Sequence, residues 1–176
     1  MNPIKRYLID YINNRINRKN RIPHLNISFR DAKEFGLLFT WENEEKYSQV
    51  KEVVKFLEIH SKNAELLCFV KNPKDKFSRE LSVFFEKDIS MFGKVKSRAV
   101  EGFITKTYDF LWHLDLDCNS MIQYILSRTH ARCRIGKADP ESQQFYEMMI
   151  ASENGINFKE LCEQVLHYTK SITTYA

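Results

Sequence analysis

Residues 108–117 read YDFLWHLDLD, and three of their side chains could do acid–base or metal chemistry. The segment is an apolar run that closes on His113, Asp115 and Asp117. Side chains alternate along a strand, so these three groups would share one face, together with Asp109. An imidazole beside two carboxylates can take up a proton or hold a divalent ion. We therefore treat these residues as candidate catalytic groups.

A structural explanation fits the same residues. Asp115 and Asp117 could be solvated at a strand end and cap the following helix, which would leave His113 as a half-buried core imidazole. In open α/β sheets, however, ligands collect beyond the carboxyl ends of the strands, where both carboxylates would lie. Both interpretations require residues 108–117 to form an interior strand.

A second candidate site is cationic and lies in SRTHARCRIGK, residues 127–137. Its anion-binding candidates are Arg128, Arg132, Arg134 and Lys137. Such cations could receive phosphate or carboxylate. Alternatively, they offset the dipole of a helix end, and Arg132 and Arg134 both lie on the solvent side of an edge strand, where they discourage edge pairing.

A basic N-terminal segment, residues 1–24, is the third candidate. Its basic residues are Lys5, Arg6, Arg15, Arg18, Lys19 and Arg21, against the single acidic residue Asp10. The whole chain has a net charge of +4, so the remainder is close to neutral. Ile4, Leu8, Tyr11 or Ile12, and Ile16 recur at helical spacing. This pattern predicts an amphipathic basic helix.

Such a helix has several possible partners. It could lie on an anionic membrane surface or contact a partner protein. Nucleic acid is a weaker candidate, because the aromatic stacking platforms of RNA-recognition domains are absent. The apolar stripe could instead simply pack on the rest of the protein.

Alternating strands and helices would position these residues. Strands are expected at residues 35–41, 64–70, 82–90, 108–116 and 132–136, with a further strand preferred at 145–151 and a short one possible at 100–104. Three helices are expected to begin at an Asn43 N-cap, at a Ser120–Gln123 capping box and at an Asn157–Glu160 capping box. The order predicts a single doubly wound α/β domain with a mostly parallel sheet and helices on both faces, Rossmann-like or flavodoxin-like.

Several kinds of chemistry are missing from the sequence. The five glycines do not occur at the spacings of the dinucleotide-binding glycine fingerprint or of a P-loop. The sequence also has no nucleophile elbow. Four scattered cysteines give no zinc ligand set and suggest reduced thiols in the cytoplasm. No apolar stretch approaches the roughly 20 residues that cross a bilayer. We therefore expect no cofactor and no metal.

Two resemblances accompany these patterns. IPHLNISFRDAKEFGLLFTW, EKDISMFGK, TYDFLWHLDLD and ARCRIGK together resemble a family of uncharacterised bacterial proteins known only as a domain of unknown function. YDFLWHLDLD followed by a helix and ARCRIG is similar to the acceptor-side, Rossmann-like half of heptosyltransferase-type glycosyltransferases. The first resemblance implies a fold without an activity.

The expectations combine into two hypotheses. The leading one is a small cytoplasmic α/β binding or interaction module, with residues 1–24 as a basic helix and residues 25–176 as one domain. The alternative is an enzyme or degenerate enzyme related to the acceptor half of a glycosyltransferase. Its acidic strand-end crevice would hold His113, Asp115 and Asp117.

Overall fold

Strands and helices alternate along most of the chain, as the sequence predicts. The computed structural model describes residues 1–20, 27–151 and 155–172. The strands are β1 Glu34–Thr40, β2 Asn63–Phe69, β3 Val83–Phe84, β4 Thr107–His113, β5 His130–Lys137 and β6 Met148–Ile150. The helices are α1 Pro3–Lys19, α2 Glu44–Ile59, α3 Arg98–Thr105, α4 Ser120–Arg128 and α5 Phe158–Ser171, with 3-10 turns η1 Glu86–Asp88 and η2 Gln143–Phe145.

The sheet has the strand order β3-β2-β1-β4-β5-β6, and every pair of neighbouring strands is parallel. This is the Rossmann order, in which the direction of winding reverses between β1 and β4. The predicted doubly wound α/β fold is therefore confirmed. Residues 108–113 lie in β4, an interior strand between β1 and β5.

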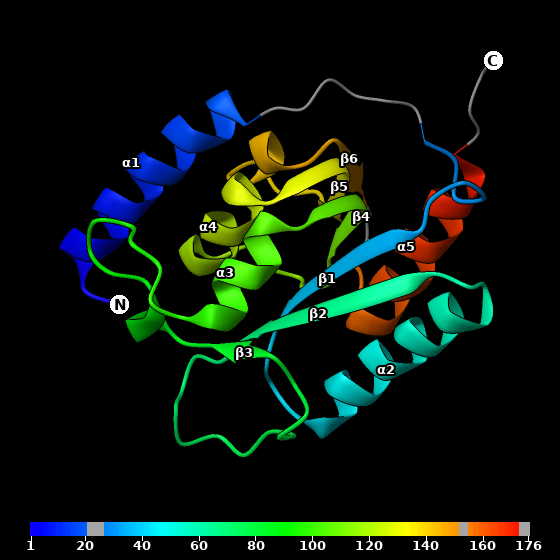
Figure 1. Ribbon diagram of the computed structural model, residues 1–176, viewed down its shortest axis with the longest axis horizontal. Coiled ribbons are helices and arrows are strands. Elements are labelled where there is room, and N and C mark those ends of the chain that lie inside the picture. Colours follow the sequence, from blue (N-terminus) through cyan, green and yellow to red (C-terminus); the bar gives the residue numbers. More distant parts are fainter. Residues whose placement is uncertain (21–26, 152–154, 173–176) are drawn as a thin grey trace.

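Helices cover both faces of this sheet (Figure 1). Helices α2 and α5 pack on one face over a core that contains Phe35, Trp112 and Leu161. Helices α3 and α4 pack on the other face over Leu111 and Tyr108. Helix α1 lies outside α4 as an additional layer (Figure 1). No helix in the described residues is long and apolar enough to cross a membrane.

Asparagine side chains cap four of the described helices, including α1, where Asn2 accepts from the Ile4 amide. Asn43 accepts a hydrogen bond from the Lys46 amide, and Asn157 forms a capping box with Glu160, so both predicted helix starts are confirmed. At α4 the predicted start was wrong by one residue. Asn119, rather than Ser120, is the N-cap and accepts from two backbone amides.

Three predicted elements need correction. Residues 100–104, predicted as a possible strand, belong to α3, because Ser97 caps a helix whose Val100 and Phe103 are buried three residues apart. The strand predicted at 82–90 shrinks to β3 followed by η1. The strand preferred at 145–151 is confirmed, but it is shorter than predicted and corresponds to β6.

Candidate functional site

The carboxyl ends of β1 and β4 meet where the winding of the sheet reverses, which is the usual ligand-binding region of such folds. Thr40 ends β1, His113 ends β4, and Asp115 follows two residues later. All three are buried, with at most 3% of their surface exposed. The region is therefore filled by polar side chains that must find hydrogen-bond partners inside the protein.

Asp115 is the centre of this group. Its Oδ1 accepts hydrogen bonds from the Thr40 amide at 3.1 Å and from Lys46 Nζ at 2.6 Å. Its Oδ2 accepts from Thr40 Oγ1 at 2.7 Å and lies 3.2 Å from His113 Nε2. The carboxylate thus ties the ends of β1 and β4 to the first turn of α2.

Lys46 supplies the positive charge that balances Asp115. Its side chain is only 6% exposed, and its Nζ also contacts Glu42 Oε1 at 2.5 Å. The ammonium lies 4.9 Å from the centre of the Phe158 ring on α5. The charge is therefore shared between two carboxylates and an aromatic face.

His113 extends the network to the other side of the sheet. Its Nδ1 lies 2.7 Å from the Tyr146 hydroxyl, and the two rings are nearly parallel. With Nε2–H donating to Asp115, Nδ1 is left to accept from the hydroxyl. Burial raises the pKa of Tyr146 well above its usual value, so the phenol stays a donor. Carboxylate, imidazole and phenol form one chain.

The charges in the network shift two pKa values. Burial alone would raise the pKa of Asp115, but the His113 imidazole and the Lys46 ammonium outweigh it and lower that pKa. Burial alone would lower the pKa of Lys46, but Asp115 and Glu42 outweigh it and raise that pKa. Both groups are therefore held in their charged forms.

The lowered pKa of Asp115 should make the protein sensitive to acid. The native carboxyl binds a proton less tightly than the unfolded one, whose pKa is about 3.9. Its contribution is present above that value and is lost as the pH falls through the native pKa. We expect the free energy of unfolding, measured in urea at pH 7 and pH 3, to fall less in Asp115→Asn than in the native sequence. Equal losses in both proteins would contradict this assignment.

Asp117 does not join His113 and Asp115. It is exposed, so the structure brings together two of the three candidate catalytic residues and leaves the third in solvent. The capping alternative is also wrong, since Asn119 and neither aspartate caps α4. In the described part of the chain, no group of three or more His, Cys, Asp and Glu side chains is placed to hold a metal ion.

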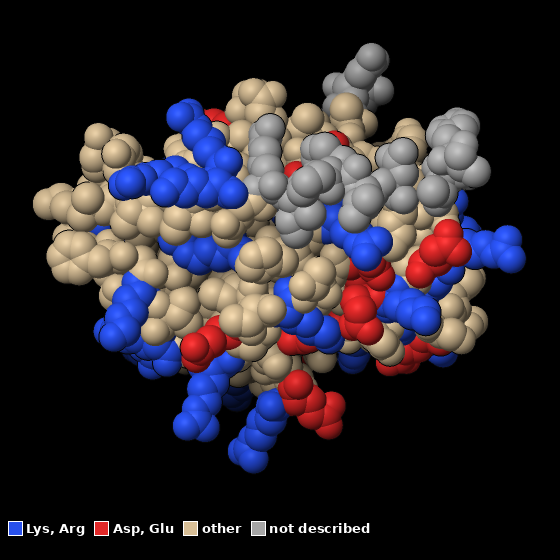
Figure 2. Space-filling model, turned by 45° about the horizontal axis from the view of Figure 1, so that its top comes forward, with Lys and Arg blue, Asp and Glu red and all other residues tan. Residues whose placement is uncertain are grey.

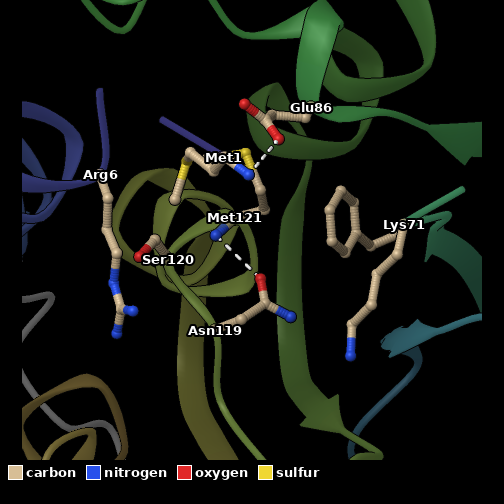
Figure 3. Close-up of a pocket in the computed structure, with 8 residues that line it drawn as sticks. Met1, Arg6, Lys71, Glu86, Asn119, Ser120 and Met121 are labelled. Atoms are coloured by element: carbon tan, nitrogen blue, oxygen red, sulfur yellow. Dashed lines mark hydrogen bonds and ion pairs between the residues drawn. The ribbon is translucent and has the colours of Figure 1, made fainter. Parts of the chain in front are cut away.

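An open pocket lies nearby at the same edge of the sheet, on the α4 side. It has a volume of about 390 Å³, and Phe69 and Met121 form an apolar part of its lining. Figure 3 shows Arg6 and Lys71 on opposite sides, with Asn119 between them. The guanidinium and the ammonium could attract a small anion, although neither residue was among the anion-binding candidates.

Arg134, one of those candidates, is instead buried. Its side chain is 3% exposed and forms a two-pronged ion pair with Glu147, with contacts of 2.6 and 2.9 Å. It also donates to Asn17 Oδ1 and to the Leu126 carbonyl. The predicted position on the solvent side of an edge strand was wrong, because β6 pairs with β5 and makes β5 an interior strand.

The other three cations of this cluster point to separate partners. Arg128 stacks on the Tyr124 ring at 3.6 Å. Arg132 lies 3.5 Å from Asp109, and Lys137 donates to the Leu116 carbonyl. The four residues do not converge on one cavity. Their role in binding an anion stays a prediction, and their contacts hold the fold together.

Helix α1 packs on the protein through apolar side chains and through two buried amides. Ile9, Asn13 and Asn17 are the buried residues of α1. Asn13 Nδ2 donates to the Ser120 carbonyl at 3.1 Å, and Asn17 Nδ2 donates to the Gln144 carbonyl at 2.6 Å. In return, Asn13 accepts from the partly buried Arg128 and Asn17 accepts from the buried Arg134. The inner face of α1 is thus fixed by directional hydrogen bonds.

The outer face of α1 exposes three large side chains, of which Ile4 and Tyr11 belong to the predicted stripe and Tyr7 does not. Ile4, Tyr7 and Tyr11 are 65%, 73% and 60% exposed. Of the predicted stripe, Ile4 and Tyr11 lie in solvent, while Leu8, Ile12 and Ile16 are partly buried. The alternative that the stripe packs on the domain therefore holds for Leu8, Ile12 and Ile16 and fails for Ile4. Hydropathy spacing did not indicate that the same helix also buries Asn13 and Asn17.

Sequence reasoning also missed Lys46, Thr40 and Tyr146. No motif marks them, because Thr40 ends an apolar strand and Lys46 sits in a charged first helical turn. Tyr146 lies just before β6, 33 positions after His113 in the sequence. Only the strand order places these residues together.

Comparison with known proteins identifies a family. The family model described as "Family of unknown function (DUF6913)" matches residues 5–172. No curated protein and no solved structure gives a match. The glycosyltransferase resemblance of YDFLWHLDLD therefore stays a prediction.

Proposed function

The chain belongs to the DUF6913 family, and from that premise we propose that it is an α/β binding module that docks on an anionic membrane surface through α1. The observation that carries the proposal is the exposed stripe formed by Ile4, Tyr7 and Tyr11. These positions are three and four residues apart and so share one helical face. Large apolar groups grouped on an exposed face often mark an interaction surface.

Cationic side chains surround this stripe. Arg15, Arg18 and Lys19 line a hollow beside Tyr11 on the last turns of α1. Figure 2 shows Lys and Arg side chains gathered at the upper left, over α1, with few acidic side chains beside them. The one acidic residue of the helix, Asp10, lies 3.7 Å from Arg6. The face is therefore both apolar and positive.

This combination suits a lipid surface better than a nucleic acid. Tyrosine places a ring in the interfacial region and keeps its hydroxyl in water. An exposed isoleucine gains free energy in a lipid interface and finds no equivalent partner on a phosphate backbone. Each cation adds about 1 kcal/mol near an anionic leaflet. The inner face, fixed by Asn13 and Asn17, keeps the stripe turned outward.

Vesicle sedimentation tests the proposal. The native chain should bind vesicles of phosphatidylcholine with phosphatidylserine and bind pure phosphatidylcholine weakly. The variant Arg15→Gln/Arg18→Gln/Lys19→Gln should lose about 3 kcal/mol, or about two orders of magnitude in affinity for the anionic vesicles. High salt should weaken native binding in the same way, because it screens exposed charges.

Two matched variants control for unspecific effects. Lys74→Gln/Lys76→Gln removes exposed cations from the loop after β2. Tyr168→Ser removes a tyrosine that is 49% exposed on α5. Both should bind like the native chain, whereas Tyr7→Ser/Tyr11→Ser should bind less. Equal binding by the α1 variants, or tighter binding to a DNA duplex than to vesicles, would refute the proposal.

Two further expectations belong to this proposal. The four cysteines are free thiols, which supports a reducing, cytoplasmic location. The separate position of α1 outside the sheet layers supports treating the N-terminal segment as a contact segment and the rest of the chain as the domain that carries it. The end of the predicted segment 1–24, with Arg21, and the start of the predicted domain 25–176 lie outside the described residues. Fractionation of cells into soluble and membrane fractions, without a carbonate wash, would test the location.

A further inference from the structure

One edge of the sheet is only partly closed. β3 pairs with β2 at two positions, Cys68 with Val83 and Phe69 with Phe84. The first part of β2, from residue 63 to residue 67, pairs with β1 on its inner side and has no strand on its outer side among the described residues. Such an edge offers a row of backbone groups to a further strand.

The hydrogen-bond register identifies the groups that point outward. The amides of Cys68 and Val70 donate toward β3, to the carbonyls of Ser82 and Phe84. The Asn63 amide donates to the Lys33 carbonyl beside β1. Because the direction alternates along a strand, Ala64 and Leu66 share the outward direction of Cys68. In the described residues, neither of these two amides has a strand to pair with.

A groove runs beside this open edge. Its volume is about 720 Å³, and it lies between α2 and β2. Ala64 and Leu66 line it from the strand, Tyr47 and Val54 line it from α2, and Leu81 lines it from the loop before β3. Most of these side chains are only partly buried. Charged side chains also line the groove: Lys51, Lys55, Glu58, Glu65 and Glu80. The groove therefore offers apolar contacts next to unpaired backbone groups.

We propose that an extended segment of a partner protein adds to the sheet along Ala64–Leu66 and lays alternate side chains in this groove. Main-chain hydrogen bonds would hold the segment, and the pocket between α2 and β2 would select its side chains. This surface lies on β2 and α2, so it does not depend on the membrane contact of α1. The two contacts together would make the protein an adaptor.

A second copy of the chain fits the edge less well. A two-fold axis that pairs the residue 63–67 segments antiparallel would place Glu65 opposite Glu65 of the other copy. Like charges at opposite positions destabilise a strand pair. A foreign segment can place an uncharged or basic residue opposite Glu65 and so avoids this repulsion.

The test uses short peptides selected from a random displayed library against the native chain. Selected peptides should bind with an affinity that Leu66→Pro lowers by about tenfold or more, since proline removes the outward amide. Leu66→Ile keeps the amide and the apolar side chain and should bind like the native chain. On peptide addition, amide exchange should slow at Ala64 and Leu66.

A proline at an outward position of an edge strand should leave the fold intact, which separates binding from unfolding. Circular dichroism should show a folded Leu66→Pro, whereas Glu65→Pro, whose amide faces β1, should unfold. Equal peptide binding by Leu66→Pro and the native chain, unchanged exchange at Ala64 and Leu66, or no selected peptide would overturn the inference. The inference would also be overturned if the native chain self-associates and Leu66→Pro abolishes that self-association. The occupant of the edge would then be a second copy of the chain.

Discussion

Replacing Asp115 with alanine should lower the free energy of unfolding by about 3–5 kcal/mol, the usual cost of removing one partner from a buried ion pair. The substitution leaves the ammonium of Lys46, which is 6% exposed, with Glu42 as its one remaining carboxylate partner among the described residues. The hydroxyl of Thr40 and Nε2 of His113 lose their acceptor as well. Urea unfolding followed by circular dichroism measures the change.

Asp117→Ala is the matched control for this prediction. Asp117 is two positions away, of the same type and exposed, so its loss should change stability by no more than about 0.5 kcal/mol. A loss of less than about 1 kcal/mol in Asp115→Ala would mean that water replaces the carboxylate and that the network is open. In that case the region at the ends of β1 and β4 would again be a candidate ligand site.

Replacing Arg134 with methionine should cost a similar amount, about 3–5 kcal/mol. Methionine replaces the stem of the arginine side chain but leaves the Glu147 carboxylate, which is 12% exposed, without its cation. It also removes the donor to Asn17 Oδ1, one of the bonds that fix α1. We expect α1 amides to exchange faster in this variant, in addition to the lower denaturation midpoint.

Two comparisons separate charge from packing. Arg132→Met affects a side chain that is 40% exposed, so its cost should stay within about 1 kcal/mol. In the double variant Arg134→Met/Glu147→Leu no buried charge remains unpaired, and it should be more stable than Arg134→Met alone. A double variant no more stable than the single one would show that the hydrogen bonds to Asn17 and Leu126 dominate.

The fold could be predicted because its strands are apolar and its helix starts carry local signals. The run FGLLFTW gave β1 within one residue, and Asn43 and Asn157 marked two helices at their N-caps. Local signals failed where a segment was short. Residues 100–104 were too short for periodicity to settle, and in the structure Ser97 caps a helix that buries Val100 and Phe103 on one face.

The candidate site could be predicted only in part, since its hydrogen bonds join distant segments. Alternation along β4 placed His113 and Asp115 together, but nothing in the sequence indicated that Lys46 would neutralise the carboxylate. The buried face of α1 was predicted only in part, for a related reason. Apolar residues usually face inward, but buried Asn13 and Asn17 find partners that only the folded chain supplies.

The bonds that fix α1 also bear on the order in which the chain can fold during synthesis. Asn13 and Asn17 pair with residues 107 and 127 positions later. At about 5–20 residues per second, a ribosome needs roughly 5–25 s to make those partners after α1 has emerged. During that interval the helix has neither its amide acceptors nor the surface of α4. A chaperone or a membrane could therefore meet α1 before the rest of the protein does.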